Sequence, residues 1–93
     1  SHNGLAEFPI EIVKFTNLQS LNLSNNGIER VPAEIGRLAK LQKLNLGTNG
    51  LKKLPAEIAS LKHLKMLDVS QNQFLTSELT KVRTALPQVA IND

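Results

Sequence analysis

Three glutamates recur along the chain at a fixed interval of 23 residues, at Glu11, Glu34 and Glu57. Carboxylates gathered in one column could bind a cation or exchange protons with a substrate. Each glutamate also falls near the start of a predicted short helix, where a negative charge is favourable. Lys14 and Arg37 stand three residues further on, where they could offset the charge of Glu11 and Glu34. We therefore expect this column to have a structural role.

Other chemistries lack the residues they need. The chain contains no Cys, and its two histidines, His2 and His63, have no carboxylate at the spacing of metal ligands. No spacing supports a nucleophile with its base, and no glycine-rich phosphate loop is present. The sequence predicts no enzyme activity, no metal site and no cofactor.

Asparagine recurs at the same interval, at Asn26, Asn49 and Asn72. Each asparagine follows a leucine-rich segment at a point where the chain must turn over an apolar core. Such a turn leaves backbone groups unpaired, and an inward carboxamide can both donate and accept hydrogen bonds. We expect the three side chains to form a structural hydrogen-bonded ladder.

The repeat 41–63 predicts the elements that position these residues. In segment 41–46 leucines alternate with Lys43 and Asn45, as in a short strand with one face buried. A turn is expected at Asn49-Gly50, with the glycine at positive φ, and Pro55 fits the first turn of a short helix. Because every connection passes through such a helix, successive strands can pair only in parallel. The predicted fold class is α/β, with a curved parallel sheet of three or four strands and short helices on the convex side.

A repeat unit of this size cannot bury its apolar face alone, so the repeats should stack. The interval divides a single domain, residues 1–93, into a partial repeat at 1–17, repeats at 18–40, 41–63 and 64–86, and a closing strand at 87–93. The chain begins in mid-repeat, as expected for a piece of a longer array or a truncated one. The edge of the first strand should be open or covered only by the opening segment. Charged pairs between turns are expected at Glu7 with Arg30 and at Glu29 with Lys52.

The third repeat ends differently from the others. Thr76 or Ser77 could N-cap a longer amphipathic helix with Glu78 in its first turn. The apolar stripe of this helix would comprise Leu75, Leu79, Val82 and Leu86. The pattern that a fourth strand needs then returns one residue early, with Leu86, Val89 and Ile91 in the places of Leu64, Leu67 and Val69.

The full pattern, L-x-x-L-x-L-x-x-N-x-L-x-x-L-P-x-x-I-x-x-L, resembles the leucine-rich repeat family. The P-x-E-I variant at 32–35 and 55–58 is similar to the subclass of intracellular Ras-interacting and polarity scaffolds. The resemblance implies a short right-handed horseshoe segment, or solenoid, with a role in protein–protein interaction and signalling. It implies no particular partner.

The resemblance also implies that a protein or peptide partner binds the concave face of the sheet. We call the outward strand positions the concave strip: Ser20, Asn22, Ser24, Asn25, Lys43, Asn45, Thr48, Met66, Asp68, Ser70 and Gln71, with Gly47 and, at the closing strand, Gln88 and Ala90. The strip is polar, has one apolar side chain at Met66, and lacks the Trp, Tyr and Arg typical of strong binding centres. It predicts binding of modest affinity, and an ordinary solvated sheet face is the alternative.

Three other roles stay open or are disfavoured. The segment could be a structural spacer in a larger scaffold or repeat-bearing enzyme, or it could self-associate weakly through an open strand edge. Nucleic-acid binding is not expected, because the net charge is only +3, the basic residues are scattered and aromatics make up 3% of the chain. No apolar run is long enough to span a membrane, and the lack of Cys and of a visible signal peptide favours a cytoplasmic location.

Overall fold

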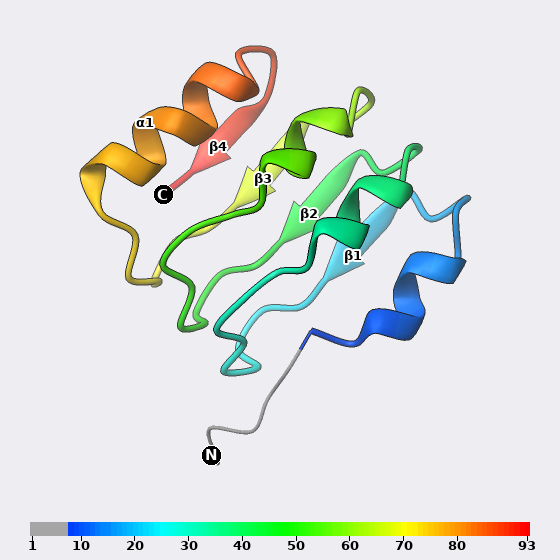
Figure 1. Cartoon of the computed structure of the whole chain (residues 1–93), viewed down its shortest axis with the longest axis horizontal. Helices are drawn as coiled ribbons and strands as arrows, with labels where there is room; N and C mark the ends of the chain where they lie inside the picture. The colour runs from blue at the N-terminus through cyan, green and yellow to red at the C-terminus, as the bar shows by residue number, and fades with distance from the viewer. Residues whose placement is uncertain (1–7) are drawn as a thin grey trace.

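The structure, a computed structural model, describes residues 8–93 and has two layers (Figure 1). One layer is a parallel sheet in the order β1-β2-β3-β4, comprising β1 (Ser20–Asn22), β2 (Lys43–Asn45), β3 (Met66–Asp68) and β4 (Ala90–Asn92). The other layer is helical and comprises η1 (Ile10–Lys14), η2 (Ala33–Arg37), η3 (Ala56–Ser60) and α1 (Thr76–Ala85). The predicted arrangement of an open parallel sheet with short helices on one side is confirmed.

The repeat interval sets the pairing of the first three strands. Ser20 lies opposite Lys43, and Lys43 lies opposite Met66, so residues 23 positions apart are neighbours in the sheet. Each of the three η helices begins directly after a proline whose carbonyl accepts a hydrogen bond from the residue three further on, such as Ile58 N to Pro55 O at 3.1 Å. Proline suits this position because its ring fixes φ near the helical value and its missing N–H is not needed.

The core lies between the two layers and is built from the inward positions of the repeat. Leu38, Leu41, Leu46 and Leu61 are fully buried, as the alternating pattern predicts. The first turn is different, because Phe15 is 64% exposed although it occupies the same repeat position as Leu38. Within residues 8–93, no strand pairs with the outer edge of β1 and no helix packs beyond η1.

Helix α1 corrects two details of the sequence prediction. Its N-cap residue is Leu75, and no side chain caps the helix, so the predicted capping role of Thr76 or Ser77 is wrong. Leu75 is 69% exposed and does not belong to the buried stripe, whereas Val82 and Leu86 are buried. The reason is that Leu75 lies in an extended conformation before the first helical turn, which places it off the face that packs on the core.

The closing strand is present as predicted, but its register is not the expected one. Ala90 pairs with Met66 and Ile91 pairs with Leu67, whereas the sequence pattern placed Val89 in the position of Leu67. Val89 N donates to Leu86 O in the same way that Leu64 N donates to Leu61 O, so Leu86 occupies the place of Leu61. Helix α1 has 10 residues where η3 has five, and the extra length shifts the strand toward the C-terminus.

The turn after each strand is also built differently from the prediction. Positive φ occurs at Asn25 (60°), Thr48 (56°) and Gln71 (57°), which are equivalent in the three turns, and at Gly27 (69°), but not at Gly50. These residues stand where the chain leaves the sheet, and the backbone bonds from Asn25 N to Gly47 O (2.9 Å) and from Thr48 N to Ser70 O (2.8 Å) hold the bend.

The predicted ion pairs do not form in the described part of the chain. Glu11, Glu34 and Glu57 lie in the first turns of η1, η2 and η3, as expected. The ion pairs found among residues 8–93 join Lys81 to Glu78 (3.2 Å) and Arg83 to Asp93, so the pairs of Glu11 with Lys14, Glu34 with Arg37 and Glu29 with Lys52 are absent. Glu7 and His2 lie outside the described residues. Residues 8–93 contain no cluster of three or more His, Cys, Asp or Glu side chains placed to hold a metal ion. No helix in this part of the chain is long and apolar enough to cross a membrane.

Candidate binding face

The inward asparagines connect neighbouring turns through the backbone rather than through one another. The amide nitrogen of Asn49 donates to Leu23 O (3.0 Å), Leu46 O (3.0 Å) and Gly47 O (3.2 Å). Its oxygen accepts from Asn26 N (3.0 Å) and Ile28 N (2.9 Å), both in the preceding turn. One side chain therefore satisfies donors and acceptors of two turns.

Asn72 repeats this arrangement one turn later. Its amide nitrogen donates to Leu46 O (2.9 Å), Val69 O (3.0 Å) and Ser70 O (3.1 Å), and its oxygen accepts from Leu51 N (2.9 Å).

Asn26 differs from the other two asparagines in the bonds that it makes within residues 8–93. It is exposed, and in this part of the chain its side chain donates only to Ser24 O (3.1 Å), in its own turn. No preceding turn within residues 8–93 offers it a strand carbonyl, because β1 is the first strand of the sheet.

A second column of polar side chains caps the ends of the strands, and the sequence prediction missed this role. Asn22 Oδ1 accepts from Ser24 N (3.0 Å) and Ser24 Oγ (2.7 Å), and Asn45 Oδ1 accepts from Gly47 N (2.9 Å). Asp68 Oδ1 accepts from Ser70 N (2.9 Å) and Ser70 Oγ (2.6 Å). The sequence signal was present as Asn or Asp followed two residues later by Ser or Gly, since such side chains commonly bond the backbone two residues on.

Asp68 is the charged member of this column. The hydrogen bond from the Ser70 hydroxyl lowers the pKa of the Asp68 carboxyl, and bonds from Ser70 N and from Asn92 Nδ2 (3.2 Å) lower it further, while partial burial opposes them. The carboxylate is therefore ionised and fixed in orientation at neutral pH.

Four side chains form a row across the sheet on the outward face. Ser20, Lys43, Met66 and Ala90 are register partners on β1 to β4, so they lie side by side. Met66 is 53% exposed between a lysine and an alanine. Met66 is long and apolar and its neighbour Ala90 is short, so the row offers an apolar contact surface at Met66 and a recess at Ala90.

A shallow hollow of about 420 Å³ covers this row and the row of Asn22, Asn45, Asp68 and Asn92 beside it. Seven residues of the concave strip line the hollow: Ser20, Asn22, Lys43, Asn45, Met66, Asp68 and Ala90. Asn92 of β4 also lines it, and this residue was not among those chosen from the sequence. The register shift of β4 explains the omission, because it brings Asn92 beside Asp68.

The other members of the concave strip do not line the hollow. Ser24 and Ser70 are held by the capping bonds, and Gly47 is buried beneath Asn45 and Asp68. Asn25, Thr48 and Gln71 are exposed on the turns that follow β1 to β3. Gln88 precedes β4 and is not part of the lining. The structure thus brings together the strand positions and separates them from the turn positions.

Comparison with known proteins agrees with this geometry. The sequence model of the protein family described as "Leucine-rich repeat region" matches residues 2–89 of this chain. No curated protein matches the chain. Among solved structures, a leucine-rich repeat protein of Leptospira interrogans is 42% identical with a TM-score of 0.91, over 95% of this chain and 22% of its own length.

Two more distant structures share the fold alone. A plant peptide hormone receptor, RGFR1 in complex with RGF2, is 24% identical with a TM-score of 0.67, over 91% of this chain and 18% of the receptor. An internalin from Listeria monocytogenes is 21% identical with a TM-score of 0.51, over 88% and 32% of the two chains. This chain spans less than a third of each of these three proteins. With stacked turns, an inward asparagine column and the family match over almost its whole length, the chain belongs to the leucine-rich repeat family.

Proposed function

We propose that this chain is a non-catalytic protein-interaction module that binds an extended protein or peptide segment in the hollow of the concave face. The observation that supports this most strongly is the exposed Met66 in a hollow where hydrogen bonds fix the side chains of Asn22, Asn45 and Asp68. Leucine-rich repeat domains generally bind proteins or peptides, and the ordered side chains of this face support such a role. Groups already held in place lose little conformational entropy when a partner arrives.

The hydrogen bonds within the hollow leave donors free for a partner. The oxygens of Asn22 and Asn45 are occupied by the capping bonds, and within residues 8–93 their amide nitrogens donate to no protein acceptor. These nitrogens lie one turn apart because Asn22 and Asn45 are register partners. They suit the backbone carbonyls of an extended segment, whose side chains would pack against Met66 and Ala90.

A peptide selection tests this proposal. Peptides selected from a displayed random library would be titrated against wild type and against the double variant Lys43→Glu with Met66→Ala. We expect the variant to bind about tenfold more weakly, because it loses the central apolar contact and reverses a charge beside it. The matched control, Lys62→Glu with Leu75→Ala, changes the same kinds of group at exposed sites outside the hollow and should bind as wild type does. Equal affinities for both variants would place the binding site elsewhere.

A second candidate function is self-association through the end of the sheet. Within residues 8–93 the outer edge of β1 has no partner, Phe15 is 64% exposed, and Leu18 and Leu21 are only half-buried. An unpaired strand edge beside apolar surface is a template for pairing with a second copy. Sedimentation at increasing concentration should then show a dimer that Phe15→Glu abolishes, and a monomer throughout would exclude it. A role as a spacer within a larger assembly, and the cytoplasmic location expected from the sequence, remain proposals that the full reading frame and cell fractionation would test.

A further inference from the structure

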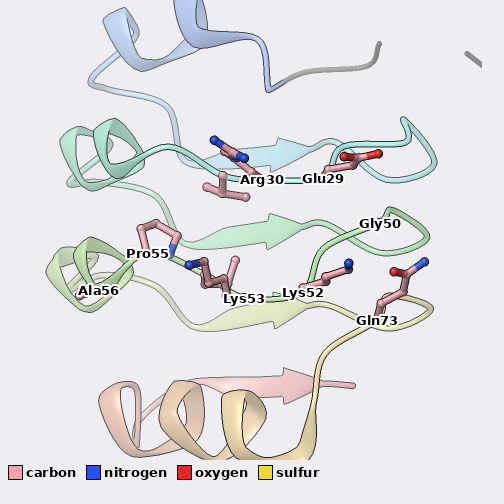
Figure 2. Close-up of a pocket in the computed structure, with 10 residues that line it drawn as sticks. Glu29, Arg30, Gly50, Lys52, Lys53, Pro55, Ala56 and Gln73 are labelled. Carbon is pink, nitrogen blue, oxygen red and sulfur yellow. The ribbon is translucent and has the colours of Figure 1, made fainter. Parts of the chain in front are cut away.

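A second hollow lies on the flank of the molecule, on the segments that run from the turns to the helices (Figure 2). Its volume is about 960 Å³, and it shares no lining residue with the hollow on the concave face. Its rim carries Glu29, Arg30, Lys52 and Lys53. We call it the flank groove.

The repeat interval stacks these charges in two columns. Arg30 lies above Lys53 and Glu29 lies above Lys52 in Figure 2, each pair being 23 residues apart in the sequence. The bonds from Gly50 N to Ile28 O and from Gln73 N to Leu51 O, both 2.8 Å, continue the stacking of the turns through this region. Segments stacked in this way lie about 5 Å apart, so three cations share a small area with a single anion.

The cations of the groove are not neutralised by the described part of the chain. Among residues 8–93, Arg30, Lys52 and Lys53 form no ion pair, and Glu29 does not reach Lys52. Like charges on neighbouring turns repel one another, and the repulsion is strongest at low ionic strength. A negatively charged ligand would relieve it.

The groove is also lined by apolar residues, which we call its floor. Val31 is buried, and Leu54 and Pro55 are half-buried. Gly50 contributes no side chain to the groove, and a Cβ there would be in ordinary contact with Glu29 Cγ at 3.5 Å. A ligand that fits must offer apolar side chains to the floor as well as negative charge to the rim.

This combination favours a polypeptide over a nucleic acid. Within residues 8–93 no aromatic side chain lines the groove, so bases would have nothing on which to stack. An extended acidic segment can instead place carboxylates against Arg30, Lys52 and Lys53 and small apolar side chains over Leu54 and Pro55. We propose that the flank groove binds an acidic, extended segment of a partner protein. This site is independent of the concave face.

Fluorescence anisotropy with a defined probe tests the proposal. The probe is a fluorescein-labelled peptide of Asp-Leu-Glu-Ser repeats, and the protein is the full chain at low and at physiological salt. Wild type should bind the peptide, and Lys52→Glu with Lys53→Glu should weaken binding about tenfold. The matched control is Lys40→Glu with Lys62→Glu, which changes the net charge equally at exposed positions outside the groove. We expect the control, and the concave variant Lys43→Glu with Met66→Ala, to stay within about twofold of wild type.

Each alternative outcome overturns the proposal. If wild type does not bind the peptide, the groove has no affinity for acidic segments. Equal losses in the groove variant and its control would show that net charge alone attracts the peptide. If oligothymidylate of matched charge binds as tightly as the peptide and is lost in the same groove variant, the surface is a general polyanion site. All four substituted lysines are exposed, so folding should be unaffected, and circular dichroism checks this.

Discussion

Asn26 makes different hydrogen bonds from Asn49 and Asn72, so replacing these repeated asparagines by alanine should lower the stability of the protein by very different amounts. In Asn49→Ala, Leu46 O keeps its bond from Asn72 and Gly47 O keeps its bond from Asn25 N. Leu23 O and Ile28 N lose the only side-chain partner they have within residues 8–93. Both residues are buried, so the variant leaves two backbone groups unsatisfied in the interior.

An unsatisfied buried polar group costs about 1–3 kcal/mol, and partial access of water reduces that cost. We therefore expect Asn49→Ala to lower the free energy of unfolding by about 2–4 kcal/mol. Asn72→Ala should cost a similar amount, because it removes the side-chain hydrogen-bond partner of Leu51 N and of Val69 O. Within residues 8–93, Asn26→Ala removes a single side-chain bond at an exposed site, and it should cost less than about 1 kcal/mol.

Urea denaturation followed by circular dichroism measures the three differences. For a typical urea dependence of about 1–3 kcal/mol per M, Asn49→Ala should lower the midpoint by about 1–2 M. The Asn26 variant is the internal control, since it makes the same chemical change at the same repeat position. If Asn26→Ala destabilises the protein as much as Asn49→Ala does, bonding between turns is not what these side chains contribute.

Four further substitutions test packing and charge in the repeats. Leu38→Ala should lower the free energy of unfolding by about 2–5 kcal/mol because Leu38 is fully buried, while Phe15→Ala at the equivalent position should cost less than about 1 kcal/mol; chemical denaturation separates the two. Gly47→Ala should cost about 1–2 kcal/mol in the same assay, because its Cβ would stand 3.2 Å from the Asn45 and Asp68 side-chain oxygens and 3.3 Å from Ser70 Oγ. Since the folded pKa of Asp68 lies below its ordinary value of 3.8, its stabilisation is complete above that pH and is lost as the pH falls through the folded pKa. Thermal melts across the acid range should therefore show a weaker pH dependence in Asp68→Asn, and an unchanged dependence would contradict the hydrogen bonds drawn to this carboxylate.

The 23-residue interval correctly predicted the features that all turns of the repeat share. The strands, their parallel order, the register of β1 to β3 and the burial of the repeating leucines all follow from residues 23 positions apart occupying the same place in successive turns. A single period is sufficient for this because each turn packs mainly on its neighbours.

The interval could not predict what differs at the ends. Asn26 matches Asn49 in sequence, yet it lacks a described preceding turn to bond, and Phe15 is exposed for the same reason. Helix α1 is longer than the helices of the other repeats, so the spacing between β3 and β4 differs from 23 residues. A fixed repeat interval therefore could not predict the register of β4.

Local backbone geometry was the other source of error. The positive φ at Thr48 rather than Gly50 follows from how the chain leaves the strand, and glycine content alone does not reveal that. In the concave strip, periodicity identified the outward positions, but it could not distinguish Asn45, which lines the hollow, from Thr48, which lies on the turn beyond it.

The most direct test of the stacked turns is measurement of nitrogen–carbonyl scalar couplings across hydrogen bonds by NMR. The structure predicts couplings from Leu23 N to Asn45 C=O, from Leu46 N to Asp68 C=O and from Val69 N to Asn92 C=O, whose N–O distances are 2.8, 2.7 and 2.8 Å. The third coupling also reports the shifted register of β4. Couplings to carbonyls one or two residues away, or the absence of all three in a folded sample, would contradict the stacking on which both proposed binding surfaces depend.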